Sequence, residues 1–374
     1  MSVLARTDTS LVGRWWWTVD HWTLAAVALL VAAGAILTLA ATPAVADRVG
    51  FDPFYFARRQ FLLLPPAVLI MFGISLLSPL GTRRLAAVGF LISLLLLAAT
   101  LFEGDEIKGA RRWLYLGTWS LQPSEFVKPT FAVVAAWMFA RAKAESHFPG
   151  TWISAALFGI VAGLLLLQPD FGMVVMIAVV WCAQFFVAGL PMAWVGLLSV
   201  LAFSGAIGAY AAFPHVAQRV DLFLNPASGD TYQIDRAIEA FANGGLLGRG
   251  PGEGVIKTII PDAHTDFIFA VAGEEFGLLA CLMMVGLFAF IVLRGLGRML
   301  EENDDFIMLA TSGLLVQFGL QAVINMGVNL RLLPTKGLTL PFISYGGSSL
   351  LALAVTVGMI LALTRRRPGG ASAP

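Results

Sequence analysis

The sequence predicts an all-α integral membrane protein with about ten transmembrane helices, in a single polytopic membrane domain over residues 1–374. Its 374 residues are 58% hydrophobic and only 13% charged, and the mean hydropathy of +0.83 is far above that of a fold with a water-facing surface. The apolar residues form long runs without the two-residue alternation of barrel strands. In lipid, such runs satisfy their backbone hydrogen bonds only as helices.

The predicted helices follow the apolar runs in order. At roughly 20 residues per span, they cover residues 22–41, 61–78, 85–102, 126–140, 152–167, 172–188, 191–212, 267–294, 306–328 and 345–364. The first follows Trp15, Trp16 and Trp17, which indicate an interfacial aromatic belt rather than a cleaved signal peptide. A short Gln168-Pro169-Asp170 break separates the fifth and sixth, and a glycine-rich entry precedes the tenth.

An even number of spans places both termini on one side of the membrane. Cations are dense in the short segments on that side, which places the termini, with the tail 365–374, in the cytoplasm. The longest connection, 213–266, is then an external loop between helices seven and eight. Its glycine-rich part, 244–254, contains Arg249 and is expected to be turn-rich and mobile.

Charge, cysteines and short motifs exclude several function classes. The net charge of +1 gives no reason to expect a nucleic-acid partner. Cys182 and Cys281 lie inside apolar runs, which argues against a disulfide framework or a thiolate metal site. HExxH, CxxC, P-loop and GxSxG patterns are absent from the sequence, so zinc hydrolysis, redox work and ATP hydrolysis have no support. The four histidines are too scattered to define a metal site.

Ionisable residues near the external ends of helices are the candidate functional groups, because charge in a membrane is costly. At the entry to helix eight, Thr265 is a plausible N-cap and Asp266 falls in the first turn, where it serves chemistry or only the helix dipole. Glu274 lies within roughly 80° of the Asp266 direction and Glu275 points away, so one is expected to join a polar pocket and the other to pair with a neighbouring helix. His264 is either part of the same polar network or an ordinary interfacial histidine.

Three further places carry polar groups. Asp170 follows a proline, and a turn explains it as well as a functional role does. Glu125 and Lys128 are three residues apart and either neutralise each other or face substrate. The segment before helix ten holds Lys336 together with Ser344 and Tyr345, although its small residues also suit close helix packing.

Four segments resemble the SEDS family of bacterial cell-wall glycosyltransferases. They read HTDFIFAVAGEEFG from His264, QPDFG from Gln168, ARRWLYLGTWSLQPSEFVKP from Ala110 and LPTKGLTLPFISYGGSS from Leu333. They occur in the family's order, and the last favours its cell-division branch over its elongation branch. Two positions depart from the family pattern: Asp262 stands where glutamate is more common, and Arg331 where a small or apolar residue is.

The resemblance implies a ten-helix fold that polymerises lipid II, an undecaprenyl-pyrophosphate disaccharide-pentapeptide, into glycan strands outside the cytoplasmic membrane. It makes the loop 213–266 periplasmic. Asp266 aligns with the family's catalytic aspartate, Trp113 and Asp170 with functional motifs, and Lys336 with a polar cavity position. The implied partners are a class B penicillin-binding transpeptidase, FtsI-like, and other cell-division proteins, beside membrane lipid.

From these residues we expect Asp266 to act as general base on the acceptor sugar's 4-hydroxyl. Cations must stabilise the departing pyrophosphate. The external candidates are Arg111, Arg112, Lys128, Arg249, Lys257 and Lys336. A divalent cation, Mg²⁺ or Mn²⁺, could share this work, with metal ligands unknown. Two other classes stay open, a lipid II flippase or secondary transporter and a non-enzymatic scaffold of the division machinery.

Overall fold

The computed structural model describes residues 10–107, 109–117, 119–189, 191–225, 231–334 and 337–366. Each of the ten predicted spans coincides with a helix: α2 (His21–Arg48), α3 (Tyr55–Ser75), α4 (Pro79–Glu103), α5 (Pro123–Ala144), α6 (Gly150–Leu167), α7 (Phe171–Val187), α8 (Met192–Ala212), α11 (Ile268–Leu300), α12 (Asp305–Asn329) and α13 (Gly347–Leu363). Seven of them are long and apolar enough to cross a membrane, and α7 and α13 are shorter apolar helices. The predicted all-α membrane fold is confirmed.

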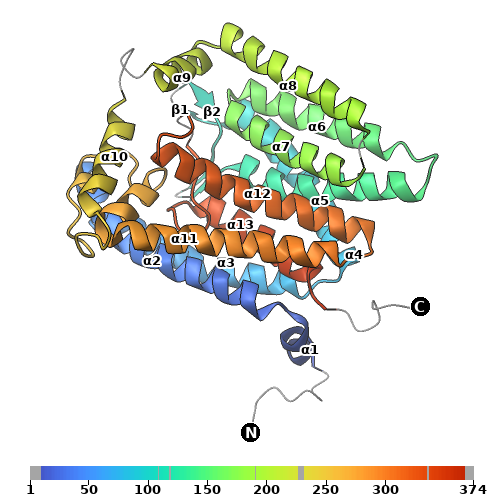
Figure 1. The fold of residues 1–374 in the computed structure, drawn as a ribbon, viewed down its shortest axis with the longest axis horizontal. Coiled ribbons are helices and arrows are strands. Elements are labelled where there is room, and N and C mark those ends of the chain that lie inside the picture. The colour runs from blue at the N-terminus through green and yellow to red at the C-terminus, as the bar shows by residue number, and fades with distance from the viewer. Residues whose placement is uncertain are drawn as a thin grey trace.

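The helices form one bundle in which α5 and α12 are largely enclosed (Figure 1). Buried apolar side chains form two clusters, one centred on α2, α3 and α11 and the other on α4, α5, α6 and α7. Both α12 and α13 contribute to each cluster and so join the halves. Because neighbouring helices cover it, α5 tolerates the charged residues Glu125 and Lys128.

The first described helix and the end of α13 lie at the same end of the bundle (Figure 1). There the short helix α1 (Leu11–Thr18) precedes α2, and the buried Asp20 carboxylate pairs with Arg294 at 2.6 Å and Arg298 at 3.2 Å on α11. Arg365 donates to the Thr18 hydroxyl at 3.0 Å. The segments that the span count assigned to the side of the termini therefore do meet.

The opposite end carries structure that the hydropathy pattern did not predict. Residues 106–121 form two antiparallel hairpins: β1 (Glu106–Ile107) with β2 (Ala110–Arg111), and β3 (Leu114–Leu116) with β4 (Trp119–Leu121). The long loop contains α9 (Pro214–Leu224), α10 (Tyr232–Gly244) and the 3-10 turn η2 (Ile256–Thr258). Helix α10 is amphipathic, with Ile234, Ala237 and Ala240 buried. Its apolar stripe is too narrow to stand out in a search for membrane spans.

The glycine-rich segment, expected to be mobile, is instead tied to a break in α11. Gly277 has φ +76° and interrupts the helix, so carbonyl and N–H groups near the break lose their helical partners. Backbone bonds replace them: Arg249 N–H donates to the Glu274 carbonyl at 2.9 Å, and Leu278 N–H to the Gly245 carbonyl at 2.9 Å. Only glycine allows this approach at position 248, where a Cβ would lie 2.2 Å from the Glu275 carbonyl oxygen.

The carboxylates of Glu274 and Glu275 hold the same segment. Glu274 accepts from the backbone N–H groups of Val255 and Ile256 at 3.0–3.1 Å. Glu275 accepts from Gly252 N–H at 3.0 Å and from the Lys257 ammonium. The expectation that one glutamate joins a polar pocket and the other pairs with a neighbouring helix is therefore wrong. The loop folds back across the helix break and reaches both faces.

Candidate functional site

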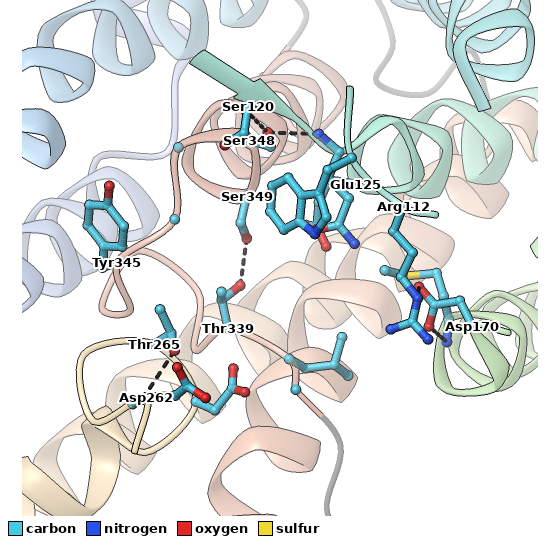
Figure 2. Close-up of a pocket in the computed structure, with 18 of the residues that line it drawn as sticks. Arg112, Ser120, Glu125, Asp170, Asp262, Thr265, Thr339, Tyr345, Ser348 and Ser349 are labelled. Atoms are coloured by element: carbon cyan, nitrogen blue, oxygen red, sulfur yellow. Dashed lines mark hydrogen bonds and ion pairs between the residues drawn. The ribbon is translucent and has the colours of Figure 1, made fainter. Parts of the chain in front are cut away.

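A cavity of about 460 Å³ opens among the N-terminal parts of α3, α5 and α7 and helix α9. The hairpins and the segments 262–266 and 337–349 complete its wall. Asp262 and Thr265 lie on one side of it and Arg112 and Asp170 on the other (Figure 2). The lining residues that carry polar or aromatic side chains are Arg59, Arg112, Trp113, Trp119, Ser120, Gln122, Glu125, Asp170, Arg219, Asp262, Thr265, Asp266, Thr339, Tyr345, Ser348 and Ser349.

Asp266 lines this cavity from a tight turn just before α11. Asp262 adopts φ +55°, and its carbonyl accepts from the N–H groups of Thr265 and Asp266, each at 3.1 Å. The α-helix starts only at Ile268 with Phe267 as its N-cap residue. The prediction that Thr265 caps the helix is therefore wrong: its hydroxyl donates to the Asp262 carbonyl at 3.1 Å.

Two asparagines of α12 fix the Asp266 backbone from behind. The side-chain amides of Asn325 and Asn329 both donate to the Asp266 carbonyl, at 3.0 and 2.8 Å. Asn325 also donates to the Leu338 carbonyl at 2.6 Å. Asn325 thus holds both the Asp266 turn and the segment that begins at residue 337, which meet at the cavity. The half-buried Asp266 lines this cavity.

Gly337 lies directly against that carboxylate. A Cβ on Gly337 would lie 2.8 Å from the Asp266 Oδ2, which is closer than non-bonded carbon and oxygen tolerate. A side chain at this position would therefore displace the carboxylate rather than the surrounding backbone.

For the polymerisation of lipid II that the resemblance implies, Gly337→Ala is accordingly expected to lower the rate by roughly tenfold or more, because a displacement of about 1 Å at a reacting group can cost 10²-fold. The unfolding temperature should change little. Gly346→Ala is the matched control, since Gly346 also lines the cavity and its added Cβ would meet its nearest atom at 3.4 Å. Equal activity of the two variants would contradict the contact.

The opposite wall is built around Arg112 and Asp170. The Arg112 guanidinium donates to the carbonyls of Gln168 at 3.3 Å and of Pro169, and its Nε lies 3.8 Å from the Asp170 carboxylate. Asp170 also caps α7 by accepting from Met173 N–H at 3.4 Å. The turn explanation of Asp170 is thus supported by its capping bond. Asp170 also lines the cavity, and its functional role stays a prediction. Trp113, the neighbour of Arg112, lines it too.

Two arginines that line the cavity, Arg59 and Arg219, were not among the residues predicted from the sequence. Arg59 on α3 donates to the Tyr55 hydroxyl at 3.0 Å and lies 5.3 Å above the Trp119 ring. Arg219 on α9 lines the cavity and interacts electrostatically with the carboxylates of Asp170 and Asp266. Both arginines lie outside the quoted motifs, and nothing in their local sequence distinguishes them from ordinary flanking cations.

Lys128 is not brought to the cavity. Its ammonium is buried and donates to the Glu125 carboxylate at 2.9 Å and to the Gln321 side-chain carbonyl at 2.8 Å. Gln321 in turn donates to the Thr339 carbonyl at 3.0 Å. Glu125 does line the cavity. The structure therefore favours the neutralising interpretation of this pair, with Lys128 supporting Glu125 and the 337–349 segment.

The other predicted cations also lie elsewhere. The Lys257 ammonium donates to the Glu275 carboxylate and to the carbonyls of Ala40 and Gly252, the last two at 3.0 and 2.9 Å. Arg249 donates to the Asn243 carbonyl at 3.4 Å, and Arg111 pairs with Glu106 at 3.6 Å. None of the three lines the cavity in the part of the chain that the structure describes. Lys336 lies outside the described residues.

Tyr345 lines the cavity, whereas Ser344 and His264 act behind it. The Ser344 hydroxyl donates to the Thr265 carbonyl at 2.5 Å and accepts from Leu340 N–H at 2.7 Å. The His264 ring lies 4.8 Å from that of Phe56 and 5.2 Å from that of Tyr345, centre to centre. These contacts join the Asp266 turn to the entry of α13.

His264 gives the fold a defined acid sensitivity. Burial lowers the pKa of His264 to about 4, below the ordinary value of about 6.5. Between these two pH values the unfolded chain binds a proton that the folded chain does not, so stability falls as the pH drops from about 6.5 to about 4. The loss amounts to roughly 3 kcal/mol. His264→Phe is expected to lose less stability than the parent between pH 7 and pH 4.5 in thermal unfolding; identical pH profiles would contradict this.

A bound divalent cation would have to rely on few protein ligands. Within the described ranges, no group of three or more His, Cys, Asp or Glu side chains is placed to hold a metal. Mg²⁺, however, is often bound by one or two carboxylates together with substrate phosphates, and Asp262 and Asp266 both line the cavity. The metal requirement stays a prediction.

Known proteins are similar in sequence to this chain over nearly its full length. The sequence model of the FtsW/RodA/SpoVE family, described as "Cell cycle protein", matches residues 20–368. A probable peptidoglycan glycosyltransferase FtsW from Caulobacter vibrioides is 48% identical over 98% of this chain and 94% of its own length. A second, from Coxiella burnetii, is 37% identical over 92% of this chain and 96% of its own length.

Solved structures share the fold. The rod shape determining protein RodA of Thermus thermophilus matches with a TM-score of 0.67 at 30% identity, over 92% of this chain and 96% of that chain. A chain from a peptidoglycan synthase complex, studied for its structural coordination of polymerization and crosslinking, matches with a TM-score of 0.77 at 31% identity, over 92% and 97%. The resemblance drawn from the four motifs is confirmed.

Proposed function

The chain belongs to the FtsW/RodA/SpoVE family, and from this premise we propose that it is a peptidoglycan glycosyltransferase that polymerises lipid II into β-1,4 glycan strands at the outer face of the cytoplasmic membrane. One observation carries the proposal. The Asp266 carboxylate and the guanidinium groups of Arg59, Arg112 and Arg219 line one cavity at the outer ends of membrane helices. The cavity thus offers a base, Asp266, and three guanidinium groups that can stabilise a leaving pyrophosphate.

In this mechanism the Asp266 carboxylate takes the proton of the acceptor sugar's 4-hydroxyl, which typically contributes 10²–10⁴ to the rate. The 4-oxygen bonds to the anomeric carbon of the donor, and the bond from that carbon to the undecaprenyl pyrophosphate breaks. Displacement from the opposite face turns the α-linkage of the donor into a β-1,4 bond.

Cations must stabilise the two negative charges of the leaving pyrophosphate. Arg59, Arg112 and Arg219 take this role in place of Lys128, Arg249 and Lys257, because these three arginines are the cations that line the cavity in the described part of the chain. A guanidinium is well suited to it, since its planar fork donates two parallel hydrogen bonds to phosphate oxygens. Lys336 remains a candidate from the sequence alone.

The protein is a multi-pass membrane protein, and we place it in the bacterial cytoplasmic membrane at the division septum with both termini in the cytoplasm. The positive-inside distribution supports this orientation, and the cavity, which residues of α9 and β2 line, lies at the end of the bundle away from α1. The partner is a class B penicillin-binding transpeptidase together with other cell-division proteins. The similarity to a chain from a complex that coordinates polymerization and crosslinking supports that choice.

Reconstitution in vesicles tests the proposal against transport. The purified protein, with and without a class B transpeptidase, is supplied with lipid II on the cavity side. We expect glycan polymer that is lost on treatment with a muramidase and that is not formed by Asp266→Ala. Movement of lipid II between leaflets without any polymer would replace the polymerase with a transporter.

A further inference from the structure

A second, smaller cavity lies beside the site and shares Arg219 with it. Its volume is about 200 Å³, and it is formed by α9, the start of α10 and Pro261. Its apolar lining comes from Leu222, Phe223, Ile234 and Pro261, and its polar lining from Arg219, Thr231, Tyr232 and Gln233. None of these residues other than Arg219 also lines the main cavity, so the mechanism above gives this space no role.

Volume indicates what each cavity can take. Pockets that bury a drug-sized ligand span roughly 300–1,000 Å³, and the main cavity, at about 460 Å³, lies within that range. A polymerase must hold a donor and an acceptor together, so the main cavity has room for the reacting ends rather than for everything attached to them. The second cavity is below the range and suits one sugar-sized unit.

The lining has the chemistry that recognises a pyranose ring. A sugar presents an apolar C–H face and a rim of hydroxyl and acetamido groups. Tyr232 and Phe223 supply aromatic surface. The amide of Gln233 supplies donors and an acceptor beside it, and the Thr231 hydroxyl, which donates to the Asp235 carboxylate at 2.5 Å, supplies an acceptor. Tyr232 is 41% exposed although its ring already contacts Arg236, with the guanidinium 5.2 Å from the ring centre. Tyr232 therefore lines the cavity in addition to contacting Arg236.

We propose that this cavity is a subsite for an N-acetylated pyranose of the growing glycan strand, beyond the disaccharide that reacts. The inference rests on the proposed function. In that reaction the strand is attacked at its pyrophosphate-bearing sugar, so the strand, and not lipid II, has further sugars to place. The subsite holds the strand between additions, and Arg219 lines both it and the main cavity.

Product length tests the subsite. In Tyr232→Ala and Gln233→Ala, mean chain length should fall about fivefold, because losing one hydrogen bond or ring contact changes a dissociation constant by roughly that factor. The initial rate of joining two lipid II molecules should stay within about twofold. Ile238→Ala is the matched control, being on the same helix, 40% exposed and outside the cavity. Unchanged lengths, or equal loss of the first coupling and of elongation, would overturn the proposal.

A binding measurement separates the subsite from the proposed function. A lipid-free, peptide-free N-acetylated tetrasaccharide is added to the full-length Asp266→Asn protein, and saturation-transfer NMR reports contact. We expect a signal in this protein and about fivefold weaker binding when the same chain also carries Tyr232→Ala. If this holds while the parent makes no polymer, the polymerase proposal fails and the subsite stands. If the parent polymerises but the tetrasaccharide gives no signal, or only a peptide-bearing glycan binds, the sugar subsite is wrong.

Discussion

Asp266→Asn is expected to lower polymerisation of lipid II by at least about 100-fold, the lower range of what a general base contributes. The amide keeps the shape of the side chain but cannot take a proton at neutral pH. The backbone of residue 266 should stay in place, because Asn325 and Asn329 hold its carbonyl and not its carboxylate. The rate of glycan formation by purified protein and the unfolding temperature together check this prediction.

Asp262→Asn is the matched control for Asp266→Asn, because it removes a second carboxylate charge from the same cavity. Asp262 lines the same cavity and has φ +55°, a conformation that asparagine adopts readily. If only negative charge mattered, the two variants would lose similar activity. We expect the Asp262 variant to retain activity within about tenfold of the parent, since it removes no base from the reaction. Normal strand synthesis by Asp266→Asn would remove Asp266 from the role of base.

Lys257→Met is expected to destabilise the protein by roughly 3–5 kcal/mol, the usual result of leaving one charge of a buried pair without its partner. The side chains of Lys257 and Glu275 are 8% and 0% exposed. The ammonium also donates to the Ala40 carbonyl of α2, so η2 would lose one of its links to that helix, beside those that Arg48 makes to the Thr258 and Ile260 carbonyls. Denaturant or thermal unfolding in detergent measures the effect.

A double variant identifies the cause. Adding Glu275→Gln to Lys257→Met removes the stranded carboxylate and should recover more than half of the lost stability. Arg249→Met is the control, because its cation belongs to the same segment but makes only an exposed hydrogen bond to the Asn243 carbonyl; its effect should stay within about 0.5 kcal/mol. If the single and double variants are equally unstable, the pair is not what holds the segment.

Hydropathy and motif order predicted the helices well and the details of the site less well. The runs that became α2 to α8 and α11 to α13 were readable because each is apolar along its own length. The position of Asp266 at the cavity was indicated by its motif. The partners of Glu274 and Glu275 were not, because extrapolating one helical direction from Asp266 fails where a turn precedes Ile268.

The sequence by itself determined that this chain folds as membrane-crossing helices, since lipid leaves backbone groups no other partners, and it determined the family through four long motifs. Only the tertiary structure decided which charges share the cavity. It selected Arg59, Arg112 and Arg219 and assigned Lys128 and Lys257 to buried pairs. The reason is that apolarity is a property of a segment, whereas convergence of charges depends on how distant helix ends and folded-back loops are placed against one another.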